Sequence, residues 1–107
     1  MKSETREIRN NKTIRCKVTS ENKSREYSYI FTITKSDNKI IIRHSDEEIT
    51  VSLTDNQWGN VIPIGGESTI GGAVMYGIIL VFERDLKNNI EKFAVMTVEG
   101  VTAIEFE

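Results

Sequence analysis

The sequence has few of the residues that mark a disulfide-bonded or metal-binding protein. One cysteine, Cys16, and one histidine, His44, stand in a chain of 107 residues. One cysteine excludes a disulfide within the chain, and with one histidine it cannot form the four-ligand nitrogen and sulfur site that zinc requires. We therefore expect no metal, no cofactor and a reducing, cytoplasmic location.

Long apolar segments are also missing. The longest weakly polar run, residues 70–82, contains three glycines and is too short to cross a bilayer as a helix. The first ten residues, MKSETREIRN, carry charges where a secretory signal would have its apolar stretch. We expect neither a membrane segment nor a signal peptide.

The rest of the composition is that of an ordinary globular protein. Hydrophobic residues make up 38% and charged residues 28% of the chain, which argues against wholesale disorder. A chain of this length forms one domain with one core. We expect a single β domain over residues 1–107, in which residues 1–11 are a flexible or peripheral N-terminal segment.

Apolar and polar residues alternate along several segments, which is typical of strands with one buried face. The pattern is clear in residues 14–18, 27–34 and 49–53, and the turn-forming residues 36–38 lead into the β-branched residues 40–43. Further strands are expected at residues 73–83, 90–98 and 101–106. Thr54 and Gln57 match a capping box, which predicts a helical turn over residues 55–60.

Short strands at close spacing, with no segment long enough for a crossover helix, indicate an antiparallel arrangement. The predicted fold class is therefore all-β with one or two short helical turns: an antiparallel β-sandwich or small barrel of six to seven strands. Within the predicted hairpin of residues 73–98, residues 74–82 and 93–98 are apolar on both strand faces. Either this hairpin lies centrally in a sheet, or it forms a homodimer interface.

No catalytic constellation is evident. His44 and Asp46 would share a strand face, but no nucleophile accompanies them, and a solvated histidine at a strand end explains the pattern. Cys16 alternates with Ile14 and Val18 and is expected to be buried. The glycine-rich residues 65–72 lack the Lys and Ser or Thr of a nucleotide-binding loop, so a connector is favoured. These absences predict a binding protein and not an enzyme.

The charges are unevenly distributed along the chain. Residues 1–25 carry a net charge of +5 and residues 26–107 a net charge of −7, from the total of −2. The acidic part suits a basic protein partner such as a toxin or nuclease. An inhibitor or immunity-type protein would have such a partner. The residues predicted to bind this partner are Asp46, Glu47, Glu48, Trp58, Glu99, Glu105 and Glu107.

An alternative is a small β-barrel that binds single-stranded nucleic acid or an apolar small ligand. Arg15 and Lys17 lie near the aromatic residues Tyr27, Tyr29 and Phe31 in the sequence, and such residues can form a stacking platform. The same aromatics also match a core face. The acidic balance of the whole chain makes nucleic acid the second choice.

Overall fold

The computed structural model describes residues 2–22, 25–53, 61–64, 77–88, 90–97 and 100–107. Their regular structure consists of strands only, which confirms the all-β prediction. No helix within these ranges is long and apolar enough to cross a membrane. The strands are β1 (Ser3–Glu7), β2 (Thr13–Asn22), β3 (Arg25–Ser36), β4 (Lys39–His44), β5 (Glu47–Ser52), β6 (Val61–Ile64), β7 (Ile78–Asp85), β8 (Ile90–Met96) and β9 (Val101–Phe106).

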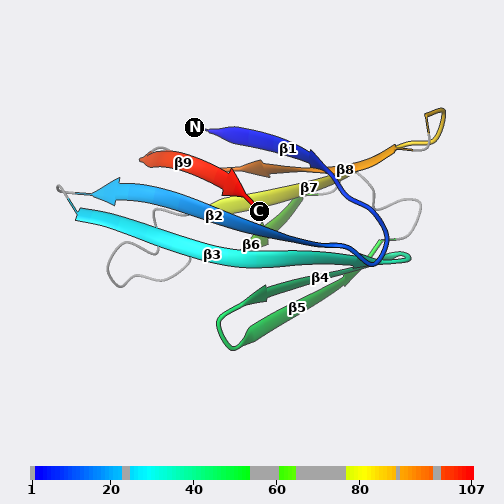
Figure 1. Ribbon diagram of the computed structural model, residues 1–107, viewed down its shortest axis with the longest axis horizontal. Helices are drawn as coiled ribbons and strands as arrows, with labels where there is room; N and C mark the ends of the chain where they lie inside the picture. The colour runs from blue at the N-terminus through cyan, green and yellow to red at the C-terminus, as the bar shows by residue number, and fades with distance from the viewer. Residues whose placement is uncertain (1, 23–24, 54–60, 65–76, 89, 98–99) are drawn as a thin grey trace.

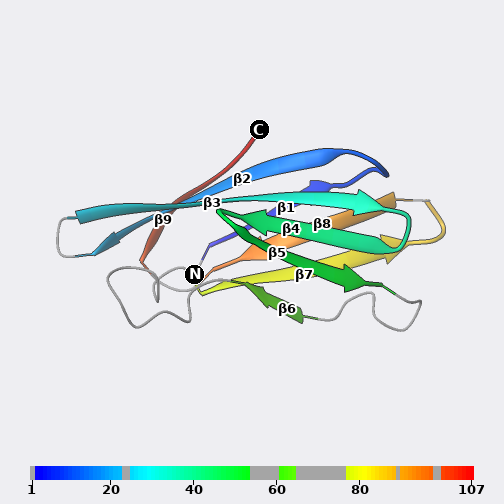
Figure 2. The ribbon, with the colours of Figure 1, turned by 90° about the horizontal axis from the view of Figure 1, so that it is seen from below.

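The strands form two antiparallel sheets packed as a sandwich (Figure 1). The four-stranded sheet has the order β1-β8-β7-β6, and the five-stranded sheet has the order β5-β4-β3-β2-β9. In Figure 2 the long β2–β3 hairpin lies over the strands of the four-stranded sheet. The edges β1 and β9 lie on one side of the sandwich, so the first and last strands are neighbours that belong to different sheets.

Two strands lie outside the segments predicted from the alternating pattern. In β1 every residue is exposed, and its sequence, Ser-Glu-Thr-Arg-Glu, has no apolar face to reveal a strand. In β6 there are only four residues, one of them Pro63. The predicted helical turn at residues 55–60 and the predicted connector at residues 65–72 lie outside the described residues.

The core is built from the alternating positions of both sheets. Phe82 and Phe93 lie side by side in the four-stranded sheet, with ring centroids 5.7 Å apart, and Phe93 meets Phe106 of β9 edge to face at 5.8 Å. Aromatic pairs in this geometry add to the free energy gained by burying their area. The other fully buried apolar side chains of the five-stranded sheet include Cys16, Val18, Phe31, Ile33 and Ile40.

The central position of residues 78–96 agrees with one of the two alternatives drawn from the sequence. Strands β7 and β8 are flanked by β6 and β1. On their outer face Ile79, Val81, Ala94 and Met96 are half-buried. From the distance between strands and the rise per residue, these side chains cover an area on the order of 200–300 Å². An exposed apolar patch of this size is ordinary for a monomer. The homodimer through residues 73–98 stays a prediction.

Burial should make the Cys16 thiol inert. The side chain is 0% exposed, and burial raises the pKa of the thiol to about 12, so almost no thiolate forms at neutral pH. We expect a bulky maleimide to label the native protein at least a hundredfold more slowly than the protein in urea. Cys16→Ala should reduce the free energy of unfolding by about 1–2 kcal/mol. Rapid labelling of the native protein would contradict the inward register of β2.

Candidate partner-binding surface

A straight row of side chains crosses the outer face of the five-stranded sheet. In the strand registers Arg15 lies opposite Thr32, Thr32 opposite Arg43, and Arg43 opposite Glu48, and the backbones of Arg15 and Glu107 exchange hydrogen bonds. An ion pair closes each end of the row: Arg15 Nη1 is 2.8 Å from Glu107 Oε2, and Arg43 Nε is 2.7 Å from Glu48 Oε2. The row therefore carries no net charge.

The acidic residues predicted to bind a partner do not form one patch. Glu107 and Glu48 lie at opposite edges of the five-stranded sheet, about 19 Å apart from the spacing of its strands. Glu105 lies opposite Lys17 in the register of β9 with β2. Three of the predicted residues therefore lie beside basic side chains: Glu105 and Glu107 beside Lys17 and Arg15 of β2, and Glu48 beside Arg43 of β4. Trp58 and Glu99 lie outside the described residues.

Asp46 and Glu47 are placed differently from these paired acids. Asp46 lies in the turn between β4 and β5, and Glu47 begins β5 opposite His44. Both side chains are exposed, and neither forms an ion pair with a described residue. Figure 1 shows the hairpin on the side of the molecule remote from β9. The tip of the β4–β5 hairpin, which we define as Ser45, Asp46 and Glu47, therefore carries two carboxylates that no described basic side chain neutralises.

The shared strand face predicted for His44 and Asp46 is wrong. Ser45 has a φ of 53°, in the left-handed region, so the chain turns between the two residues and does not continue as a strand. His44 ends β4 and is half-buried, so it is only partly solvated. Its ring stacks on Tyr29 with centroids 3.9 Å apart, and its Nδ1 donates a hydrogen bond of 2.9 Å to the carbonyl of Ile30. These contacts give the imidazole a packing role.

Arg15 and Lys17 lie on the opposite face of the five-stranded sheet from Tyr29 and Phe31. The register pairs Cys16 with Phe31 and Val18 with Tyr29, so both aromatic side chains share the core face, where Phe31 is 1% exposed. Arg15 and Lys17 alternate with Cys16 and so point outward. A base stacked on these aromatics would not reach the basic side chains from the same surface.

One ion pair that the sequence analysis missed joins the two sheets. Lys35 Nζ of β3 lies 2.7 Å from Glu91 Oε2 of β8, and the Lys35 side chain is only 6% exposed. Arg84 Nε lies 3.4 Å from Glu91 Oε1, and Arg84 Nη2 donates a hydrogen bond to Asn38 Oδ1. The signal was present in the alternation, because Lys35 continues the inward series of Phe31 and Ile33.

A hollow of about 390 Å³ adjoins this ion pair. Acidic and basic side chains line it in equal number. The hollow therefore favours neither an anionic nor a cationic ligand. Its lining residues are Glu7, Ile8, Arg9, Asn10, Lys35 and Glu91. In the part of the chain that the structure describes, no three His, Cys, Asp or Glu side chains gather closely enough to hold a metal ion.

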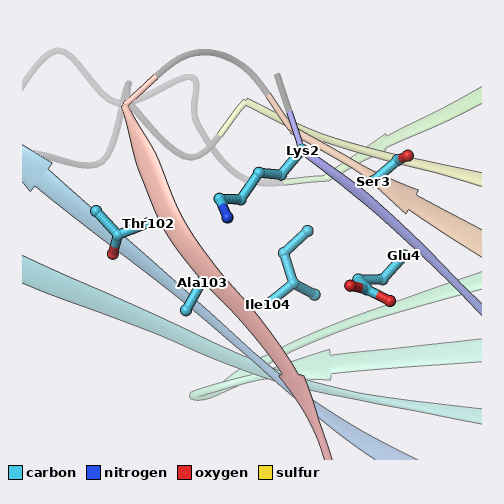
Figure 3. Close-up of a pocket in the computed structure, with 6 residues that line it drawn as sticks. All are labelled: Lys2, Ser3, Glu4, Thr102, Ala103 and Ile104. Atoms are coloured by element: carbon cyan, nitrogen blue, oxygen red, sulfur yellow. The ribbon is translucent and has the colours of Figure 1, made fainter.

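A second hollow is a groove of about 480 Å³ between the edges β1 and β9. Figure 3 shows Lys2 and Glu4 of the N-terminal segment pointing toward β9, Ser3 pointing away, and Ile104 pointing back toward β1. Farther along the same seam the Arg6 guanidinium lies 4.9 Å from the centre of the Phe106 ring. The groove is thus mostly polar, with charges of both signs from Lys2 and Glu4 and one large apolar side chain, Ile104.

No family model, curated protein or solved structure matches this chain.

The ion pair between the sheets should matter more for stability than the ion pairs of the outer row. Glu91→Ala leaves Lys35 buried without its counter-charge, so we expect the free energy of unfolding to fall by about 3 kcal/mol. Glu107→Ala removes an exposed ion pair and should cost less than about 1 kcal/mol. Urea unfolding of the two variants tests the difference. Equal losses would mean that the Lys35–Glu91 pair is as weak as a surface pair.

The position of Glu47 can be checked through Tyr29. The pKa of the Tyr29 hydroxyl is raised by burial and, to a smaller extent, by the negative charge of Glu47. Glu47→Gln should therefore lower this pKa, as followed by NMR of the tyrosine ring carbons. Glu48→Gln is the matched control, because Glu48 lies on the opposite face of β5, and it should leave the Tyr29 pKa unchanged. Equal shifts in both variants would contradict this arrangement.

Proposed function

We propose that the chain is a non-enzymatic binding protein that docks a basic protein partner through the tip of the β4–β5 hairpin. The observation that carries the proposal is that Asp46 and Glu47 are exposed and form no ion pair with a described residue, whereas Glu48 and Glu107 are paired with arginines. A partner's Lys or Arg side chains can approach these two carboxylates without displacing an existing partner. Because the two carboxylates are exposed to water, we expect them to raise chiefly the rate at which the partner associates with this chain.

The rigidity of the hairpin supports the same proposal. Strand β4 is anchored in the core by Ile40 and Ile42, which are 0% and 2% exposed, and Leu53 just beyond β5 is also buried. The two ends of the hairpin are held by backbone pairing from Lys39–Ser52 to His44–Glu47. A preorganised tip loses little conformational entropy when a partner binds.

An inhibitor or immunity-type protein is the class that these features fit. Such a protein acts by covering a surface of its target, so it needs charge complementarity and a fixed scaffold and no reacting group. The inert Cys16 thiol and the packed His44 ring are consistent with this class. Trp58, predicted as an aromatic anchor, stays a prediction.

The proposal is tested by reversing the charge of the tip. In the native host, a photo-crosslinking amino acid at position 45, an exposed residue of the tip, should give an adduct with a basic protein. Asp46→Lys with Glu47→Lys should weaken binding of that protein at least tenfold at low salt and less at high salt. The melting temperature should change little, because exposed charges contribute little to folding.

The matched control uses the acids at the far edge of the same sheet. Glu105→Lys with Glu107→Lys introduces the same change in net charge, but away from the tip, and should weaken binding far less. If both pairs weaken binding equally, the net charge and not the hairpin tip is responsible. If neither does, and substitutions of Arg15 and Lys17 abolish binding, the nucleic-acid alternative takes precedence.

A further inference from the structure

Among the described residues the two sheets end in four edge strands, and three of these are protected against pairing with another chain. An edge strand presents unpaired backbone N–H and C=O groups, which charges, proline or short length make unsuitable for pairing. Strand β1 has Glu4 and Arg6 on its inward face, and β6 has four residues including Pro63. Strand β9 faces β1 across the groove, and its register with β2 shifts between Thr19 and Ser20.

Strand β5 has none of these protections along most of its length. Its six residues, Glu-Glu-Ile-Thr-Val-Ser, contain no proline or lysine, and its register with β4 runs without a shift. The two glutamates are confined to its first positions. All its residues are exposed except the half-buried Val51, and Ile49 is 41% exposed although it shares the core-facing side of the sheet.

The hydrogen bonds between β4 and β5 define which backbone groups of β5 are not used by any described strand. Leu53 N donates to the carbonyl of Asn38, which makes these two residues a hydrogen-bonded pair. Because such pairs alternate along an antiparallel ladder, Glu47, Ile49 and Val51 direct their backbone groups toward β4. The N–H and C=O groups of Glu48, Thr50 and Ser52 point away from the sheet.

We propose that β5 pairs with β5 of a second copy of this chain, antiparallel and around a two-fold axis at Thr50. In this register Thr50 lies opposite Thr50 of the second copy, and Glu48 lies opposite Ser52. On the core-facing side Ile49 lies against Val51 of the second copy, which covers the most exposed apolar side chain of the strand. The two five-stranded sheets become one continuous sheet.

Charge disfavours the registers whose axis lies nearer the two glutamates at the start of β5. Moving the axis to Ile49 would bring the two Glu48 residues to about 7 Å along the strands, and moving it to Glu48 would place them directly opposite each other. With the axis at Thr50 they are about 13 Å apart. The occupant is therefore a second copy, since the strand complements itself without opposing like charges.

The association is closed and weak. A two-fold pairing uses the same edge of both copies, so it stops at two chains. One strand from each copy buries far less than the roughly 1,200 Å² of a stable interface. We therefore expect a dissociation constant on the order of 0.1 mM, so the dimer forms at high concentration and in assemblies that bring two copies together.

Disulfide trapping tests the register directly. Hydrogen-bonded pairs in antiparallel strands have Cα atoms about 5.5 Å apart, within the range that a disulfide spans. Thr50→Cys should therefore form an interchain disulfide under mild oxidation. The protein concentration should be about 0.1–0.5 mM, on the order of the expected dissociation constant. Ser52→Cys is the matched control: its copies lie about 13 Å apart and should crosslink at least tenfold more slowly. The buried Cys16 does not interfere.

Sedimentation equilibrium tests the association without a crosslink. The wild-type mass should rise from the 12.2 kDa of one chain toward twice that value as the concentration approaches 1 mM (on the order of ten times the expected constant). Thr50→Pro removes an N–H that points away from β4 and that none of the nine described strands uses, and proline is tolerated at such edge positions. This variant should stay monomeric, while Thr50→Ser should associate like the wild type.

Three results would overturn the proposal: a wild-type protein that remains monomeric at 1 mM (again on the scale of the expected constant), a folded Thr50→Pro variant that still associates, or equal crosslinking of the two cysteine variants. The proposal does not depend on the proposed function. Loss of self-association in Thr50→Pro with retained binding of a basic partner would separate the two.

Discussion

Contact between the aromatic side chains of the two sheets is the interaction on which the arrangement of every surface residue depends. Phe93 packs beside Phe82 in its own sheet and against Phe106 in the other. Because side chains alternate between the faces of a strand, burying these residues decides which of their neighbours face water. A slip of one residue would exchange the two faces entirely. The positions of Glu105 and Glu107 follow from the burial of Phe106.

Much of the fold could be predicted from the period of two in the sequence, because burial of one face leaves that pattern. Strand β2 contains residues 14–18, and β3 contains residues 27–34. Strand β5 contains residues 49–52 and ends one residue before Leu53. Strand β1 could not be found in this way. It is held by backbone pairing with β8, and backbone pairing leaves no mark on the choice of side chains.

Less of the candidate site could be predicted, since it depends on pairs between distant residues. The sequence places a net positive charge before residue 26 and a net negative charge after it, which suggested an acidic surface. In the structure β2 lies between β3 and β9, so Arg15 meets Glu107 and the two signs cancel. The three consecutive acids also diverge: Asp46 lies in the turn, Glu47 beside Tyr29, and Glu48 beside Arg43. A local feature, the left-handed φ of Ser45, makes that divergence possible.

The pairing of β2 with β9 has a consequence for how the protein folds. The Arg15–Glu107 contact joins residues 92 positions apart, and all strands from β3 to β8 lie between them along the chain. Closing so long a loop costs entropy before any contact compensates for it. Folding is therefore expected in milliseconds to seconds rather than microseconds. Until β9 docks, β2 has one open side, and the hairpins formed from nearby residues assemble ahead of it.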